Sequence, residues 1–184
     1  MMRWFRRNFC RYRRDEDGTI IVEFVIVAPL FVVLIAMGFE FFDAYKSYSR
    51  ASKASYTIAD FVSRQDDFNN ADLAKMHAFL DGLLPWLNGE KSLRVTWFRY
   101  DKDLGYSVDK SLNYGDNRKK LTTATIPPEI RSILPDIAHG DMVILTETKV
   151  PHRPLIDMFK MSDIVWDNAI VVRPRYHYFI PPVS

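Results

Sequence analysis

The sequence predicts an α+β protein in which a long N-terminal helix precedes a small domain of one further helix and an antiparallel sheet. Three patterns lead to this prediction. An apolar stretch at 19–42 runs into a segment at 43–64 that contains neither glycine nor proline. Apolar and polar residues alternate from Leu93 onward and are followed by turn residues, and two β-rich runs lie nearer the C-terminus. Helical periodicity therefore dominates the first part of the chain and strand periodicity the second.

The stretch from Thr19 to Phe42 has the length and composition of a membrane-spanning helix. Glu23 and Glu40 are its only ionisable residues. As a helix it would be roughly 36 Å long, against a bilayer hydrocarbon core of about 30 Å. Pro29 does not exclude a span, because neighbouring groups can satisfy the backbone carbonyl that a proline leaves unbonded. We therefore expect a single helix that crosses a lipid bilayer.

The basic residues on either side of this stretch predict its orientation. Six arginines precede it and three basic residues follow it closely: Arg3, Arg6, Arg7, Arg11, Arg13 and Arg14 before, and Lys46, Arg50 and Lys53 after. The positive-inside rule keeps the more basic flank in the cytoplasm. The N-terminus is thus expected to be cytoplasmic, and the bulk of the protein to lie outside the cytoplasm.

The helix is predicted to continue beyond the membrane. Small and apolar side chains recur at steps of three and four residues, as on one face of a helix: Ala44, Tyr48, Ala51, Ser55, Ile58 and Val62. A single helix of about 45 residues follows from this periodicity. The chain is accordingly divided into a cytoplasmic leader at 1–18, a transmembrane helix at 19–42, a helical extension at 43–64 and an extracytoplasmic α+β domain at 65–184.

The outer domain is predicted to begin with a helix and a hairpin. Asn70 is expected to cap a helix that ends near Pro85. Its apolar face is formed by Leu73, Met76, Leu80 and Leu83 or Leu84. Strands at 93–100 and 106–112 are expected to pair through the turn sequence at 101–105, with Leu93, Val95 and Trp97 on one side of the first strand.

Two more strands are expected near the C-terminus, at 142–150 and 165–173. Pro174 places the end of the second one at a sheet edge, because proline cannot donate a hydrogen bond to a sheet ladder. The tryptophans of the domain are interpreted as core or interface residues: Trp86, Trp97 and Trp166. The connection at 114–141 is polar, contains prolines and carries no predicted element.

Composition excludes several classes of function. The net charge is only +2, and no basic patch for a nucleic-acid backbone is evident. The single cysteine, Cys10, lies in the leader, so the exported part has no disulfide framework and no cysteine metal site. The histidines are scattered, at His77, His139, His152 and His177, and no catalytic or cofactor motif occurs. We therefore expect no enzyme activity, no metal and no cofactor.

The junction between leader and apolar stretch carries a set of motifs of its own. Acidic residues Asp15-Glu16-Asp17 precede Gly18, and a GxxxxE pattern runs from Gly18 to Glu23. The triplet Val22-Glu23-Phe24 and the pair Pro29-Leu30 follow inside the apolar stretch. With this junction the chain resembles a type IV pilin-like precursor, and more narrowly the TadE-like proteins of the tight-adherence (Tad) pilus-assembly system. The ending Arg173-Pro174-Arg175 is also similar to that family.

The resemblance implies a pilin-like fold and a processing step. A prepilin peptidase, which is an integral-membrane aspartyl protease, would cut after Gly18 and leave Thr19 as the new N-terminus. Glu23 would then pair with the ammonium group on residue 19 of a neighbouring subunit. Phe24 stands where the related small Flp pilins carry tyrosine. This departure, together with the extra domain, favours a minor pilin or pseudopilin over a major pilin.

The resemblance also implies where the protein works and with which partners. It would be a non-enzymatic component for assembly of a Tad or Flp adhesion pilus, in a bacterial inner membrane with its C-terminal domain in the periplasm, and it could enter the surface pilus itself. Its partners would be the prepilin peptidase, other pilin-like subunits, the Tad assembly machinery and the lipid bilayer, with no nucleic acid.

Two other classes of protein remain open from the sequence. One is a plain signal-anchored protein with an extracytoplasmic binding domain. The other is an exported periplasmic protein, since Phe5-Arg6-Arg7-Asn8-Phe9 loosely resembles a twin-arginine signal and Ala36-Met37-Gly38 a cleavage site. The mature N-terminus separates the three, because it would be Thr19, an intact start, or a residue near Phe39. Glu23 also has a simpler interpretation, in which its side chain reaches the membrane interface.

Overall fold

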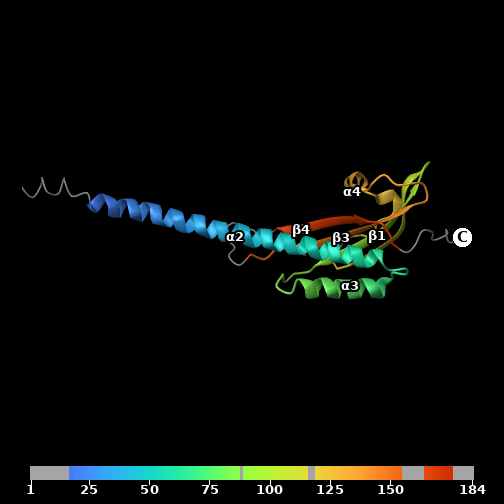
Figure 1. Cartoon of the computed structure of the whole chain (residues 1–184), viewed down its shortest axis with the longest axis horizontal. Helices are drawn as coiled ribbons and strands as arrows, with labels where there is room; N and C mark the ends of the chain where they lie inside the picture. The colour runs from blue at the N-terminus through green and yellow to red at the C-terminus, as the bar shows by residue number, and fades with distance from the viewer. Residues whose placement is uncertain (1–16, 88, 116–118, 155–163, 176–184) are drawn as a thin grey trace, which may run out of the picture. The chain divides into compact units, whose positions relative to one another are not determined.

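The computed structural model describes residues 17–87, 89–115, 119–154 and 164–175. The elements are, in chain order, α2 (Asp17–Ser63), α3 (Asn70–Leu83), β1 (Ser92–Asp101), β2 (Gly105–Tyr114), the 3₁₀ turn η1 (Thr123–Thr125), α4 (Pro128–Ile133), β3 (Met142–Pro151) and β4 (Val165–Val172) (Figure 1). The chain divides into two compact units, at 1–42 and 43–184, which are described separately. The predicted α+β class is confirmed.

The long helix predicted from the sequence is present as α2, which has 47 residues. It runs without a break through Pro29 and Gly38. Its last turn closes with backbone bonds from Arg64 N to the Phe61 carbonyl and from Gln65 N to the Val62 carbonyl, at 3.2 and 3.1 Å. These bonds satisfy carbonyl groups that a helix end otherwise leaves without partners.

The second part of α2 belongs to the outer unit and packs on the sheet. The expected stripe is largely correct, because five of its members are buried: Ala44, Ala51, Ser55, Ile58 and Val62. Tyr48 is the exception, with 46% of its surface exposed. Its ring instead borders the interface, at 5.3 Å from the Trp166 ring. The buried residues are mostly small, so the helix lies close to the strands.

Helix α3 is capped one residue earlier than the sequence predicted. Asn69, not Asn70, is the N-cap, and its side-chain oxygen accepts hydrogen bonds from Ala71 N and Asp72 N at 2.8 and 3.2 Å. Asp72 completes a capping box by accepting from Asn69 N at 3.3 Å. The hydrogen bond from Lys75, followed by the one from Asn69 N, lowers the pKa of the Asp72 carboxyl below its ordinary value. Two adjacent asparagines made either position chemically acceptable as the cap.

The four strands form one antiparallel sheet in the order β2-β1-β3-β4. The predicted hairpin is confirmed as β1 and β2, and the two C-terminal strands as β3 and β4. A register shift between Trp97 and Phe98 marks a bulge in the hairpin. β4 lies at an edge of the sheet, as Pro174 had suggested.

Helices cover the two faces of the sheet with separate hydrophobic clusters. On one face, α2 and α3 lie beside the sheet (Figure 1) and pack against β1 and β3. This cluster includes Ala51, Ile58, Val62, Leu73, Leu80, Leu93, Val95, Trp97 and Ile144. On the opposite face, Phe98, Val143 and Leu145 pack with Leu121, Ile126, Ile130, Leu134 and Ile137. The alternation predicted for Leu93, Val95 and Trp97 is therefore the observed one.

The segment that covers this second face was not predicted to carry an element. It contains η1 and the short helix α4, which begins with proline in its first turn. Ile130 is the buried residue of α4, and Ile126 and Leu134 flank it. A helix of only six residues offers too few turns for a recognisable apolar period.

Candidate functional site

All four residues predicted to act in processing and assembly lie at the start of α2. Gly18 is in its first turn, Thr19 follows, and Glu23 and Phe24 lie one turn later. Glu23 is exposed, and Phe24 exposes 70% of its surface. On an α-helix, residues four apart lie on the same side. Thr19 and Glu23 thus share one side of α2. The leader residues, including Cys10 and the arginine pair, lie outside the described residues.

The helix around these residues presents an apolar surface on every side. Between Ile20 and Phe42 its large apolar side chains are exposed, and none of the most apolar window is buried inside the structure. A helix in the core of a soluble domain would bury such a stretch, whereas a helix in lipid does not need a protein cover. Among the described residues, α2 is the helix long enough and apolar enough to cross a membrane.

Glu23 places a carboxylate within this apolar surface. The structure records no hydrogen bond or ion pair for Glu23 among the side chains that it describes. Glu23 is the seventh residue of α2, so it lies nearer the start of the helix than its middle. A charged group near the end of a membrane helix costs less than one at its centre, because its side chain can reach the interface.

In the outer unit, α2 is joined at three points along its length to β3, β4 and the chain just after β4. Trp166 Nε1 donates a hydrogen bond to Ser47 Oγ at 3.1 Å. Ser55 Oγ and Thr148 Oγ1 lie 2.6 Å apart, and Thr148 is paired with Asn168 in the sheet. Because these contacts advance in the same order on the helix and the strand, α2 and β4 run in the same direction.

The third point involves the Arg173-Pro174-Arg175 ending. Arg175 N donates to the Ser63 carbonyl at 2.8 Å, and Arg175 Nη2 lies 2.8 Å from Asp60 Oδ1. The ending therefore fastens the chain after β4 to the last turn of α2. The sequence pattern alone indicates no such role, since these partners are more than a hundred residues apart.

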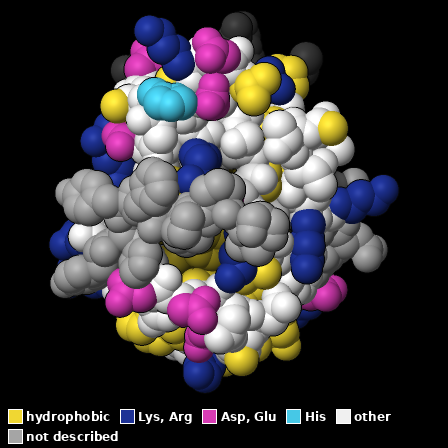
Figure 2. Space-filling model, turned by 90° about the vertical axis from the view of Figure 1, so that its right-hand side faces the viewer, with side chains coloured by type: hydrophobic (Ala, Val, Ile, Leu, Met, Phe, Trp, Pro, Cys, Tyr) yellow, Lys and Arg dark blue, Asp and Glu magenta, His cyan; other side chains and the backbone are white. Residues whose placement is uncertain are grey.

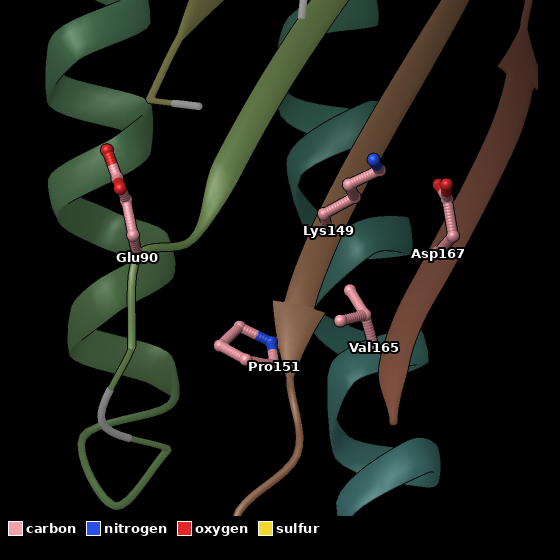
Figure 3. Close-up of a pocket in the computed structure, with 5 residues that line it drawn as sticks. All are labelled: Glu90, Lys149, Pro151, Val165 and Asp167. Carbon is pink, nitrogen blue, oxygen red and sulfur yellow. The ribbon is translucent and has the colours of Figure 1, made fainter. Parts of the chain in front are cut away.

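An open pocket of about 420 Å³ lies on the face of the sheet opposite α2. Lys149 and Pro151 on β3 and Val165 and Asp167 on β4 line it, with Glu90 from the segment that leads into β1 (Figure 3). The close contact of this segment with β3 requires Gly89, because a Cβ atom there would meet Pro151 Cγ at 2.4 Å. The lining combines apolar side chains with two carboxylates and one ammonium group.

Several titratable groups of the outer unit are engaged in structural contacts. His77 Nε2 lies 2.8 Å from the Lys91 carbonyl, and its Nδ1 lies 3.3 Å from Asp81 Oδ2. No group of three or more His, Cys, Asp or Glu residues that could hold a metal ion occurs in the part of the chain that the structure describes. His177 lies outside that part. Burial raises the pKa of Tyr106, whose hydroxyl donates to the Pro135 carbonyl.

The view of the outer unit in Figure 2 shows basic and acidic side chains interspersed across the face. No area of one sign of charge dominates it among the residues drawn in colour. A surface that binds a nucleic-acid backbone carries clustered Lys and Arg side chains. This face does not have that distribution.

In the part of the chain that the structure describes, the fold comprises one candidate membrane-spanning helix followed by an α+β domain. Residues 18–60 match the family model of the TadE-like proteins, so this part of the chain is similar to that family. The match begins at Gly18 and ends three residues before the end of α2. It supports, at family level, a protein associated with the Tad pilus, and the family is a structural and assembly family rather than an enzyme family. Comparisons with curated proteins and with solved structures yield no match.

Proposed function

We propose that this chain is a membrane-anchored minor pilin or pseudopilin that takes part in assembly of a Tad-type adhesion pilus. The observation that carries the proposal is the TadE-like match, which starts at Gly18 and covers the exposed apolar part of α2. The Arg-rich leader then lies in the cytoplasm and the α+β domain in the periplasm, as the positive-inside rule predicts. Partners are the other pilin-like subunits and the Tad machinery.

A prepilin peptidase is proposed to cut between Gly18 and Thr19. This peptide bond lies in the first turn of α2, where helices fray most readily because their N–H groups lack intrahelical partners. Glycine lowers the stability of a helix by about 1 kcal/mol relative to alanine. The same residue leaves room for the backbone in a narrow active site. Local unwinding at Gly18 would therefore present the bond in an extended form.

Cleavage would create the partner that Glu23 lacks. The new N-terminus on Thr19 would carry an ammonium group at the positive end of α2, next to the exposed apolar side chains that begin at Ile20. An ionised glutamate within a membrane helix costs roughly 2.5 to 3.5 kcal/mol on insertion scales. Pairing with the ammonium group of a neighbouring subunit would offset that cost. Because the uncut chain has no such group, processing would be coupled to assembly.

The mass of the N-terminal peptide from native membranes tests the processing step. We expect a chain that starts at Thr19. An intact N-terminus would support a plain signal-anchored protein instead, and a start near Phe39 would support an exported protein. Gly18→Val should block the cut, because its side chain would enter the narrow site. Gly38→Val is the matched control, since Gly38 lies in the same helix with open space around its Cβ position.

The Glu23 pairing is tested by Glu23→Ala and Glu23→Gln in cells that make the complete pilus system. We expect the cut after Gly18 to persist, and incorporation into the assembly to be lost. If both variants are processed and incorporated as the wild type is, the pairing is wrong. Orientation has its own test. A C-terminal alkaline-phosphatase fusion should be active, and a stable but inactive fusion would reverse the topology.

A further inference from the structure

The outer edge of β4 is a sheet edge whose hydrogen-bonding groups can be assigned. His152 N donates to the Ile164 carbonyl at 2.8 Å, one pair beyond the pairing of Pro151 with Val165. Hydrogen-bonded and non-bonded pairs alternate in antiparallel sheets. Trp166, Asn168, Ile170 and Val172 therefore direct their backbone groups to β3. Val165, Asp167, Ala169 and Val171 direct theirs away from it.

Nothing in the described part of the chain pairs with the outward groups of Val165, Ala169 and Val171. The strand has eight residues, of which Asp167 is the one charged residue, and it contains neither lysine nor proline. Proteins commonly protect exposed edges by Lys, Pro, bulges or a covering segment. β4 shows none of these devices within its described residues.

The other edge of the same sheet, β2, is protected. It carries Lys110 beside the bulge at Trp97 and Phe98, and the segment before α4 covers it. Val108 N donates to Thr123 Oγ1 at 3.0 Å, and Leu121 N donates to Ser111 Oγ at 3.0 Å. Within the residues that the structure describes, the two edges of this sheet therefore differ, and only the β2 edge is protected.

The pocket opens beside this edge, on the side to which the outward residues point their side chains. Two of its lining residues, Val165 and Asp167, are themselves edge residues of β4 (Figure 3). Lys149 and Asp167 are direct neighbours across β3 and β4. Glu90 adds a further carboxylate, for which the described residues supply no ion pair. Among the described lining residues, two carboxylates therefore stand against one ammonium group.

We propose that the outer edge of β4 binds an extended segment of a partner polypeptide as an added strand, and that the pocket receives a Lys or Arg side chain of that segment. Backbone hydrogen bonds to an edge supply affinity in this mode of recognition, and pockets for alternate side chains supply specificity. The edge and the pocket are independent features that meet at Val165 and Asp167. The proposal goes beyond a role in the pilus and does not depend on it.

A partner chain fits this edge better than β4 of a second copy does. Two β4 strands paired antiparallel would be related by a two-fold axis normal to the sheet. Because α2 runs in the same direction as β4, the two α2 helices would then be antiparallel. A second β4 strand would also bring no Lys or Arg side chain to the pocket, since Asp167 is its one charged residue. The proposed occupant is therefore an extended, basic segment of another protein.

Full-length protein in lipid nanodiscs would be panned against a phage-displayed library of random linear peptides. Enriched sequences should alternate apolar and polar residues and carry Lys or Arg at one position. Affinities of the synthetic peptides would be measured by fluorescence anisotropy. Failure to enrich such peptides, or enrichment of acidic ones, would overturn the proposal.

Ala169→Pro tests the edge directly. It removes an outward N–H, while the ladder to β3 uses the groups of Asn168 and Ile170. Proline is tolerated at such edge positions. We expect peptide affinity to fall at least about tenfold, since a buried backbone group loses its partner and the ring intrudes. Ala169→Thr retains the N–H and should change affinity less than about twofold. Equal affinity of Ala169→Pro and wild type would refute binding at this edge.

Three further measurements keep the outcome decisive. If Ala169→Pro fails to fold, peptides N-methylated at alternate positions replace it, and only one of the two methylation patterns should abolish binding.

Glu90→Gln should weaken the binding of basic peptides by about twofold to fivefold, as expected for an exposed ion pair. An unchanged affinity would exclude the pocket. Light scattering follows self-association, and dimers that Ala169→Pro disrupts would make a second copy the occupant and the proposal wrong.

Discussion

Arg94 and Glu147 face each other across β1 and β3 in a two-point ion pair. Arg94 Nε lies 2.6 Å from one carboxylate oxygen and Nη2 lies 2.7 Å from the other, and both side chains are about nine-tenths buried. Arg94 Nη1 also donates to the Lys119 carbonyl at 3.0 Å. The pair thereby joins the two central strands to the segment that covers this face of the sheet.

Loss of one partner of this pair should be costly. We expect Glu147→Ala to lower the free energy of unfolding by about 3–5 kcal/mol, because it leaves a buried guanidinium without its counter-charge. The double variant Arg94→Met with Glu147→Leu should be close to neutral, since it removes both charges together. Urea unfolding of the full chain in detergent micelles, followed by tryptophan fluorescence, measures both. A single variant as stable as the double one would contradict this account.

Ser55 of α2 and Thr148 of β3 form a hydrogen bond between the helix and the sheet. Both residues are fully buried, and Ser55 Oγ also donates to the Ala51 carbonyl at 2.8 Å. Ser55→Ala should destabilise the outer unit by about 1–3 kcal/mol, because Thr148 Oγ1 loses its partner in the interface. Adding Thr148→Val, which removes that hydroxyl, should restore most of the loss. Thermal unfolding by circular dichroism tests whether the two changes are coupled in this way.

Substitutions at Gly115 and Gly105 distinguish the cost of backbone strain from the cost of a steric collision. Both have positive φ angles, of 70° and 74°. A Cβ atom on Gly115 would meet the Lys91 carbonyl oxygen at 2.3 Å, whereas one on Gly105 meets nothing within 4 Å. Gly105→Ala should therefore cost about 1–2 kcal/mol of stability, from the left-handed conformation alone. Gly115→Ala should cost at least about 1 kcal/mol more, through the added collision. Equal losses in chemical denaturation would refute the role of the close contact.

The turn between β1 and β2 should weaken in acid. Asp101 Oδ1 accepts hydrogen bonds from Asp103 N and Leu104 N at 2.8 and 3.2 Å, and these bonds lower the pKa of Asp101 below its ordinary value of 3.8. A lowered pKa in the folded state stabilises the fold above the ordinary value, and this stabilisation is lost as the pH falls through the lowered pKa.

Amide exchange at Leu104 would follow that loss. Protection of this amide should decrease as the pH falls below about 4, once exchange rates are corrected for pH. In Asp101→Asn the decrease should be smaller, because the amide side chain does not titrate. Asp103→Asn is the matched control and should behave as the wild type does. Protection that is constant down to the lowest pH would show that the carboxylate does not hold the turn.

The sequence predicted the elements whose signal is local. The apolar run and the absence of Gly and Pro after it predicted α2, and alternation before the turn at 101–105 predicted the hairpin. The helix α4 was missed because it is short and starts at a proline. Asn70 was predicted to be the cap, whereas Asn69 is the observed one. The two adjacent asparagines are equally suited to that position, so the sequence could not distinguish them. In each case the strength of the short-range pattern decided the outcome.

Features that depend on register could not be predicted in the same way. The pairing of Arg94 with Glu147 and the outward N–H of Ala169 follow from how β1, β3 and β4 align, and these strands are far apart in the chain. The hydrogen bond from Arg175 N to the Ser63 carbonyl depends on where β4 ends relative to α2. At the start of α2, by contrast, Gly18 and Glu23 could be identified from sequence motifs, because these residues lie close together in the chain.

The parallel course of α2 and β4 has a mechanical consequence. The contacts of Ser47, Ser55 and Ser63 with the sheet side are spread along the helix axis. Tension applied along α2 loads these contacts in shear, so they share the force and must yield together. A helix attached at right angles would peel away one contact at a time. The outer unit is thus built to remain attached when its own long helix is pulled.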